Sequence, residues 1–323
     1  MPGRIGPEET DSAFRGFRYL RALERLGPRA LDADAWRPLA PMLTITDRPP
    51  AEGATPIDGA WAASPDNHRR LNAEGYLVSP VVVDRTLLDR VRDAVTALVA
   101  QGFPPMTALI YDEIYQLYAS IGQALAPILG ENAMLLLDDC WAFYVPPADP
   151  AFARWTAFPP HRDWIGGDER LMSGGLPTSM QAWVAMTDVT PDDSCLYVVP
   201  ADADAAYRTT ARSVTADQFR LQDVRAVPVS RGQIIVFTTH LAHWGSRSSE
   251  RAVEPRISTA CYLQSRHLAK DRPSAVDFQR PVPLELRLKW MLTGLRLVIG
   301  QEQASAFAEK LGVMLDTSTA SRY

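Results

Sequence analysis

Apolar residues recur at helical spacing in the first part of the chain and again near its end. The clearest case is residues 84–98, where the apolar positions fall on one helical face and Asp84 is a suitable N-cap. The same periodicity predicts four further helices. They span residues 12–26, 67–76, 112–129 and 283–315.

Between the helices the pattern changes to short β-like runs, separated by clusters of Gly, Pro, Asp and Ser. The predicted strands span residues 76–83, 134–144, 180–187, 196–199, 233–237 and 256–264. Helices followed by several short strands favour a mainly β fold with flanking helices, either an antiparallel sandwich or a jelly roll.

This pattern predicts three parts of the chain. Residues 1–62 form an N-terminal helical and loop extension, and residues 63–268 form the β domain. Residues 269–323 form a C-terminal helical extension, which we expect to pack on the core or on the second subunit of a homodimer.

The composition is that of an ordinary soluble protein and excludes several functions. The 323 residues are 46% hydrophobic and 22% charged, with a formal net charge of −5. This charge argues against nucleic acid as a partner, and no apolar run of about 18 residues predicts a membrane span. Three scattered cysteines and no apolar leader segment favour a cytoplasmic location.

Histidine and aspartate form the most informative motif. His161 and Asp163 are two residues apart, so on a strand both side chains would point to one face. Two further histidines, His240 and His243, follow the strand predicted at 233–237, and the spacing favours His243. Two imidazoles and one carboxylate make a facial triad, which binds iron(II) and leaves positions open for a chelating cosubstrate and oxygen.

The strand at 256–264 places Arg256 and Ser258 on one face. An arginine that points into a barrel requires an anionic partner, and a guanidinium matches a carboxylate through two parallel hydrogen bonds. The distal carboxylate of 2-oxoglutarate is a suitable partner, with Ser258 and Ser246 as further candidates to bind it. The alternative is a surface arginine that pairs with Glu250 or Glu254.

These motifs together resemble the phytanoyl-CoA dioxygenase family of iron(II)- and 2-oxoglutarate-dependent oxygenases. The resemblance covers residues 67–264 and joins the His161/Asp163 motif, His243 and Arg256 to three longer segments. These are LNAEGYLV at 71–78, AWVAMTD at 182–188 and RGQIIVF at 231–237.

The resemblance implies a double-stranded β-helix, the jelly-roll or cupin-like core. It also implies iron(II) bound by His161, Asp163 and His243, with 2-oxoglutarate and O2 as cosubstrates, and hydroxylation of an unactivated C–H bond. The chain departs from the family's usual sequence at Ser194-Cys195 and at residues 200–203. Asp163 is present, which disfavours the halogenating branch of the family.

The substrate is predicted only as a small molecule. Five residues are candidates to contact it: Trp141, Phe143, Arg162, Trp183 and His240. The aromatic residues among them are equally suited to the core. Lysine is scarce relative to arginine, a bias that suits a GC-rich genome. This bias and the departures from the family's usual sequence favour bacterial secondary metabolism.

Three alternatives stay open at this point. The same cofactor chemistry could give desaturation, epoxidation or ring formation. Another divalent metal could serve hydrolysis or isomerisation, although Arg256 argues against that. A barrel without catalytic activity could bind a ligand, although an intact triad argues against that.

Overall fold

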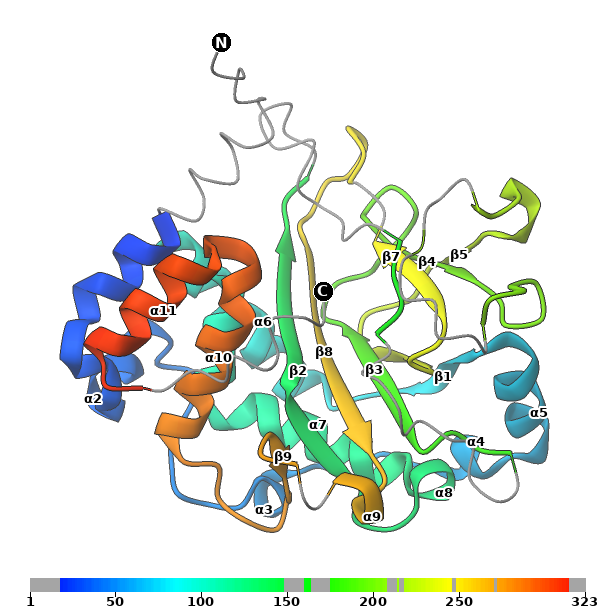
Figure 1. Ribbon diagram of the computed structural model, residues 1–323, viewed down its shortest axis with the longest axis horizontal. Helices are drawn as coiled ribbons and strands as arrows, with labels where there is room; N and C mark the ends of the chain where they lie inside the picture. Colours follow the sequence, from blue (N-terminus) through cyan, green and yellow to red (C-terminus); the bar gives the residue numbers. More distant parts are fainter. Residues whose placement is uncertain are drawn as a thin grey trace.

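The computed structural model describes residues 18–147, 160–163, 175–207, 214, 218–245, 248–269 and 272–313. Its strands form two antiparallel sheets (Figure 1). The larger sheet has the order β1-β6-β3-β8-β2-β9 and the smaller has the order β5-β4-β7. The strands are β1 (Tyr76–Val82), β2 (Met134–Val145), β3 (Ser179–Ala185), β4 (Leu196–Val199), β5 (Arg225–Val227), β6 (Gln233–Phe237), β7 (Ala242–Gly245), β8 (Arg256–Gln264) and β9 (Ala275–Val276).

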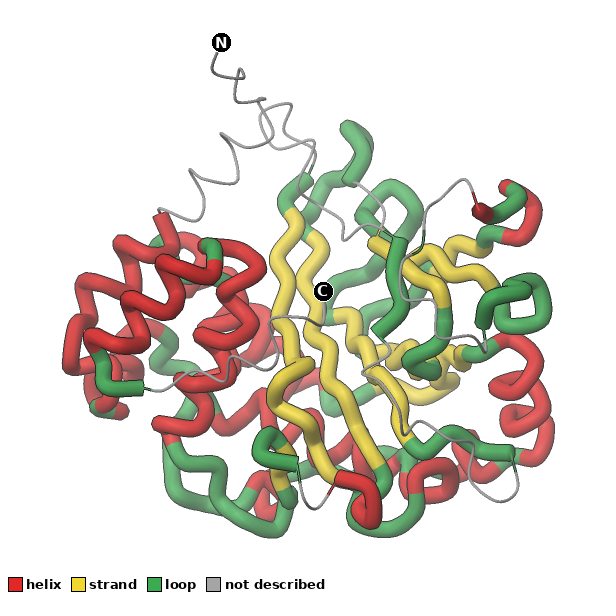
Figure 2. Tube along the Cα trace, in the orientation of Figure 1, coloured by secondary structure: helices red, strands yellow, loops and turns green. Residues whose placement is uncertain are grey.

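Helices gather on one side of the strands and around their ends (Figure 2). Residues 18–26 are helical. The longer helices are α5 (Pro65–Glu74), α6 (Arg85–Ala100), α7 (Asp112–Ala124), α10 (Leu284–Ile299) and α11 (Gln301–Lys310). The short ones are η1 (Gly27–Leu31), α2 (Ala33–Trp36), η2 (Arg37–Leu39), α3 (Pro50–Gly53), α4 (Ala60–Ala63), η3 (Pro105–Ile110), α8 (Ala126–Leu129), η5 (Leu221–Asp223) and α9 (Arg266–Ala269).

The larger sheet is covered by helices on its outer face. Tyr118 of α7 hydrogen-bonds to Thr259 of β8 and donates to the carbonyl of Ala260 over 3.2 Å. Thr259 therefore faces the helices. Its neighbours Ser258 and Ala260 face the opposite way, because side chains alternate along a strand.

The inner face of the larger sheet lies against the smaller sheet. The ring centroids of Phe237 on β6 and His243 on β7 are 4.6 Å apart. Phe237 pairs in register with Gln181 of β3 and with Tyr76 of β1, so all three side chains share this inner face. The two facing sheets with flanking helices confirm the predicted jelly-roll fold.

Most predicted elements are present in the structure. The strands at 196–199, 233–237 and 256–264 match β4, β6 and β8, and Asp84 caps α6 by accepting from the backbone N–H of Thr86 over 2.8 Å. The sequence analysis missed the short strands β5, β7 and β9. The predicted helix at 12–26 is present from residue 18, and residues 12–17 lie outside the described part of the chain.

Two predicted helices are each divided in the structure. Residues 112–129 form α7 and α8, which are separated at Leu125. The C-terminal segment divides at Gly300 into α10 and α11. Gly300 has a φ of +90°, a backbone conformation that is open to glycine and strained for most other residues. Among the described residues, no helix is both long and apolar enough to cross a membrane.

The C-terminal helices belong to the same hydrophobic core as the sheets and the N-terminal segment. Arg287 of α10 stabilises this packing, and its side chain is only 2% exposed. It pairs with Asp112 at 2.8 Å, donates to the carbonyls of Val282 and Ile110, and lies over the ring of Tyr115. The C-terminal segment therefore packs on the core of its own chain, whereas a homodimer stays a prediction.

The Arg287→Met variant is expected to lower the free energy of unfolding by about 3–5 kcal/mol, because it leaves Asp112 as a buried carboxylate without its cation. Chemical denaturation measures this change. The matched control is Arg251→Met, because Arg251 pairs with Asp192 at the surface, with 80% of its side chain exposed. The control should leave the unfolding midpoint nearly unchanged. Equal losses in the two variants would contradict the assigned role of Arg287.

Candidate metal centre

A backbone pairing brings two of the predicted ligands together. His161 and His243 exchange both hydrogen bonds, each with an N–O distance of 3.0 Å. Side chains of such a directly opposed antiparallel pair lie on the same face. The two imidazole rings accordingly lie 4.3 Å apart, measured between their centroids.

Asp163 completes the group. One carboxylate oxygen lies 3.3 Å from Nε2 of His161, and the other lies 3.5 Å from Nε2 of His243. Ligand atoms from the three residues all lie within 4.8 Å of one another. Two imidazole nitrogens and one carboxylate at this separation suit a single divalent transition metal ion. The sequence motif therefore corresponds to a real cluster, although His161 makes only an isolated bridge and not part of a long strand.

The surroundings of His243 prepare its ring for metal binding. Nδ1 lies 3.1 Å from the carbonyl oxygen of Leu241, an arrangement in which Nδ1–H donates and Nε2 keeps its lone pair. Burial lowers the pKa of His243 to about 4, against the opposing effect of Asp163. His243 is therefore neutral near pH 7, which is the state that binds a metal.

Asp163 is ionised for a different reason. Burial disfavours its charge, but nearby His243 and hydrogen bonds from His161 and Gln181 together hold its pKa below the usual value. The amide nitrogen of Gln181 also donates to Asp139 over 2.6 Å, and the indole N–H of Trp141 donates to the other oxygen of Asp139 over 2.9 Å. Asp139 thus joins Trp141 to Gln181 through two buried hydrogen bonds, and Gln181 is one of the groups that lower the pKa of Asp163.

The sequence analysis missed Gln181 and Asp139. Asp139 reaches the interior because β2 is irregular: four residues, 137–140, lie opposite the single residue Cys261 of β8. This bulge re-aims the side chains of β2. A signal was present in the sequence, because two adjacent acids, Asp138 and Asp139, interrupt an otherwise apolar strand and one of them must face the core.

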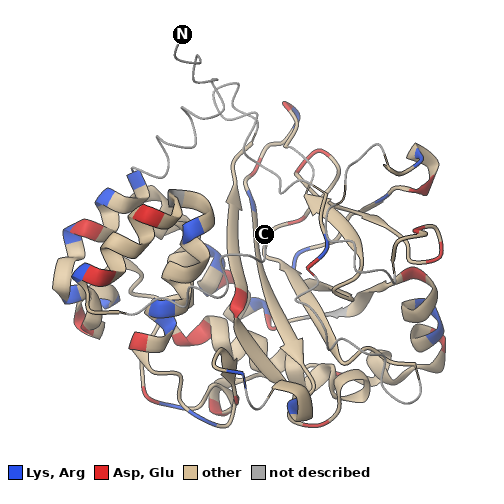
Figure 3. Ribbon diagram, in the orientation of Figure 1, with Lys and Arg blue, Asp and Glu red and all other residues tan. Residues whose placement is uncertain are grey.

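Arg256 is buried on the inner face of β8, where the sequence analysis placed it. Its side chain lies over the rings of Phe143 and Trp183, each with the guanidinium carbon 5.6 Å from the ring centroid. Its Nε atom has no hydrogen-bond partner, and no ion pair joins Arg256 to another described residue. Burial lowers its pKa to about 10, which still leaves it charged at neutral pH. Figure 3 shows few charged residues on the strands.

Ser258 lies two residues along the same face, fully buried, and its hydroxyl also has no hydrogen-bond partner among the described residues. Trp141 stacks on Phe143 with ring centroids 6.1 Å apart. Phe143 and Trp183 therefore enclose Arg256, while Trp141 holds Asp139. Ser246, the remaining cosubstrate candidate, lies outside the described residues.

Two of the predicted substrate contacts have partners within the chain. Arg162 forms a buried ion pair with Asp204 and donates through Nε to the carbonyl of His240 over 3.0 Å. Its guanidinium pairs with Asp204, a partner that the sequence analysis did not identify, and a contact of Arg162 with substrate stays a prediction. The ring centroids of His240 and Tyr207 are 6.1 Å apart. Burial, and to a smaller extent the charge of Arg162, lowers the pKa of His240.

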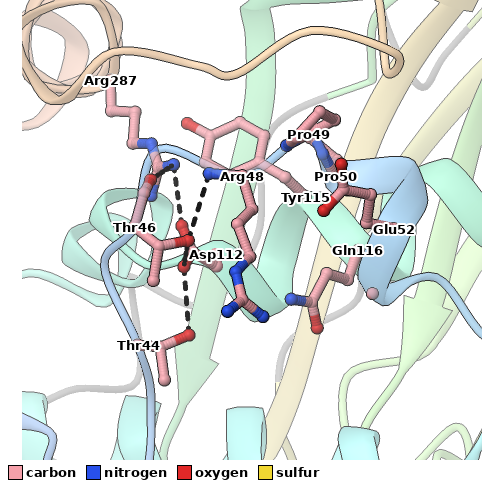
Figure 4. Close-up of a pocket in the computed structure, with 11 residues that line it drawn as sticks. Thr44, Thr46, Arg48, Pro49, Pro50, Glu52, Asp112, Tyr115, Gln116 and Arg287 are labelled. Carbon is pink, nitrogen blue, oxygen red and sulfur yellow. Dashed lines mark hydrogen bonds and ion pairs between the residues drawn. The ribbon is translucent and has the colours of Figure 1, made fainter.

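A hollow lies away from the metal cluster, between the N-terminal segment, α3, α7 and α10. It has a volume of about 330 Å³, and Arg48, Asp112, Gln116 and Arg287 are among its lining residues (Figure 4). Arg287 and Asp112 are paired with each other there. This hollow includes none of the metal-cluster residues.

Comparison with known proteins agrees with the geometry. The sequence profile of the phytanoyl-CoA dioxygenase (PhyH) family matches residues 71–252, which is more than half of the chain. The chain belongs to the PhyH family. The protein is therefore a non-heme iron- and 2-oxoglutarate-dependent oxygenase by family. No curated protein sequence matches the chain significantly.

Several solved structures are similar to this PhyH-family chain. The non-heme α-ketoglutarate-dependent epimerase SnoN from nogalamycin biosynthesis is 18% identical, with a TM-score of 0.48 over 64% of this chain and 84% of its own. The carbocyclase SnoK from the same biosynthesis is 16% identical, with a TM-score of 0.47 over 71% of this chain and 96% of its own. HygX from Streptomyces hygroscopicus, with nickel and 2-oxoglutarate bound, is 15% identical, with a TM-score of 0.44 over 62% and 86%.

The Gln181→Leu variant of the PhyH-family protein is expected to bind a divalent metal about 10- to 100-fold more weakly. The substitution removes the amide that orients Asp163, and loss of such a supporting hydrogen bond typically has this effect. Titration of the metal-free protein with cobalt(II), followed by visible absorbance, measures the affinity.

The matched control for Gln181 is Gln264→Leu. Gln264 is buried in the same sheet, and neither atom of its amide has a hydrogen-bond partner among the described residues. Its replacement should leave cobalt(II) affinity unchanged. A Gln181→Leu variant that also binds cobalt(II) like the wild type would show that the amide does not orient Asp163.

Proposed function

We propose that His161, Asp163 and His243 bind iron(II), and that Arg256 and Ser258 bind the distal carboxylate of 2-oxoglutarate. The enzyme then hydroxylates an unactivated C–H bond of a small molecule. The donor set fits the metal, because its two imidazoles and one carboxylate converge from one backbone pairing and one flanking residue. The observation that carries the cosubstrate assignment is the buried guanidinium of Arg256.

The environment of Arg256 fits a carboxylate ligand. An unpaired buried charge costs several kcal/mol, so a buried arginine without a protein anion requires another partner. Phe143 and Trp183 cover the guanidinium, which strengthens its interactions by excluding water. Nε of Arg256 and the hydroxyl of Ser258, which have no hydrogen-bond partner among the described residues, offer donors on the same face of β8. Charge-assisted hydrogen bonds of this kind are the strong ones in proteins.

The chain's own residues orient the metal ligands, bind the cosubstrate and exclude water from the site. Leu241 fixes the tautomer of His243, and Gln181 restricts the carboxylate of Asp163. Arg256 would bind the distal carboxylate of the cosubstrate and so hold the molecule in one orientation. With iron(II), 2-oxoglutarate and O2 bound, the site supplies oxidative decarboxylation to succinate and CO2, with the second oxygen atom inserted into the substrate C–H bond.

Hydroxylation is the proposed outcome because it requires that only one C–H bond be held at the metal. Desaturation, epoxidation and ring formation each require a second reacting position on the substrate. A role in bacterial secondary metabolism is part of the proposal. It is supported by the scarcity of lysine, found only at positions 270, 289 and 310, and by the departures from the usual family sequence.

Anaerobic titration of the iron(II)-loaded protein with 2-oxoglutarate tests the assignment. The wild type should develop a visible charge-transfer band that saturates at one equivalent. The Arg256→Met variant should bind 2-oxoglutarate about 10- to 100-fold more weakly, the loss expected for a hydrogen bond to a charged group worth about 1.5–3 kcal/mol.

Arg225→Met is the matched control, because Arg225 on β5 is exposed and pairs loosely with Glu74 at 3.5 Å. It should titrate like the wild type. A wild-type protein that holds one equivalent of iron(II) but develops no band would contradict the proposed cofactor chemistry. An Arg256→Met variant with unchanged affinity would place the cosubstrate elsewhere.

A further inference from the structure

We propose that Arg162 is a positioning residue for the metal centre. Its buried ion pair with Asp204 and its hydrogen bond to His240 hold the segment that carries His161 and Asp163 against the strand that carries His243. This inference rests on the proposed function, since it assumes that these three residues bind the metal. It assigns a role to Arg162 and Asp204 that ligand chemistry alone does not require.

The ion pair between Arg162 and Asp204 is almost completely buried. The side chain of Arg162 is 1% exposed and that of Asp204 is 2% exposed. Transferring two charged groups into the interior has a desolvation cost that their attraction often fails to exceed, so a buried ion pair is weak support for overall stability. Its best-attested benefit is to fix which segments pack together, and in which register.

The pair connects the segment that carries His161 and Asp163 to two other parts of the chain. Nε of Arg162 donates to the carbonyl of His240, three residues before His243. Asp204 belongs to a turn, where its other oxygen accepts from the backbone N–H of Ala206 over 2.9 Å. Tyr207 in the same turn hydrogen-bonds to Thr238 over 2.6 Å. The turn at 204–207 is therefore connected to residues 238–240, which precede β7, through both Arg162 and Tyr207.

The segment at residues 160–163 has little backbone pairing to hold it in place. Within the described part of the chain, the backbone of residues 160–163 pairs with β7 through one bridge, at His161. One bridge fixes His161 but leaves the direction of the chain at Asp163 undetermined. Side chains alternate along an extended segment, so an anchored Arg162 side chain turns those of His161 and Asp163 to the opposite side, toward the metal.

A purely structural role would give a different result, and the chain contains a matched control for it. Arg287 and Asp112 form a second buried ion pair, 2% and 8% exposed, in the helical layer. Loss of either pair should lower stability. Only loss of the Arg162–Asp204 pair should weaken metal binding.

Cobalt(II) titration of the metal-free protein tests the inference, with thermal unfolding of every variant measured in parallel. Arg162→Met and Asp204→Asn are each expected to weaken cobalt(II) binding about 10- to 100-fold, as when other groups that orient metal ligands are lost. Arg162→Lys retains the charge but not the planar fork, so it should recover part of the affinity. Arg287→Met and Asp112→Asn should lose thermal stability and keep wild-type affinity.

The outcomes separate the two proposals. A wild-type protein that binds no cobalt(II) would overturn the metal assignment itself. Wild-type affinity in both Arg162→Met and Asp204→Asn would overturn the positioning role and leave the metal assignment intact. Equal losses of affinity in the Arg287 and Asp112 controls would also overturn it, because the effect would then follow stability. If Arg162→Met does not fold, Asp204→Asn and Arg162→Lys decide the question, since both preserve side-chain size.

Discussion

The backbone pairing of His161 with His243 is the contact on which the rest of the site depends. It joins a short extended segment to the smaller sheet through two hydrogen bonds of 3.0 Å and places both imidazoles on one face. Asp163 reaches both rings only because its neighbour is held in this register. The contacts of Leu241, Gln181 and Arg162 then restrict orientations that the pairing has already made possible.

Between the two sheets, the buried carboxylate of Asp163 and the buried guanidinium of Arg256 lie apart. Asp163 lies with the histidines, whereas Arg256 lies between two aromatic rings, and no ion pair joins Arg256 to Asp163. Burying opposite charges apart is unfavourable unless ligands complete each of them. A divalent metal at the carboxylate and a dicarboxylate that reaches from the metal to the guanidinium would satisfy both ends. The arrangement therefore favours a chelating, anionic cosubstrate over a neutral one.

Local patterns in the sequence were sufficient for the long strands, the capped helix at Asp84 and the three candidate ligands. They were insufficient for β5, β7 and β9, which have two to four residues each. β4 is as short, but its sequence LYVV is an apolar run, whereas RAV in β5 and AHWG in β7 are not, and β9 has only two residues. The local patterns also missed Gln181, Asp139 and Asp204. These side chains meet their partners across sheets and turns, and such contacts depend on strand register and on the bulge in β2. Arg162 shows the same limit, because its partner is 42 residues away along the chain.

The C-terminal helices also contact the edge of the larger sheet, close to a residue that supports the site. β9 pairs with β2 only at Leu135 and Leu136, so the part of β2 that holds Trp141 has no strand on its outer side among the described residues. Such an edge exposes backbone groups that readily pair with other chains. α10 packs against β2, and a Cβ atom at Gly294 would lie only 2.3 Å from Cε of Met106 and 4.0 Å from Trp141. The terminal methyl of Met106 would have to move to admit a side chain at this position, whereas the distance to Trp141 is an ordinary van der Waals contact. Packing of α10 on β2 therefore covers the part of the strand that carries Trp141, whose indole N–H donates to Asp139.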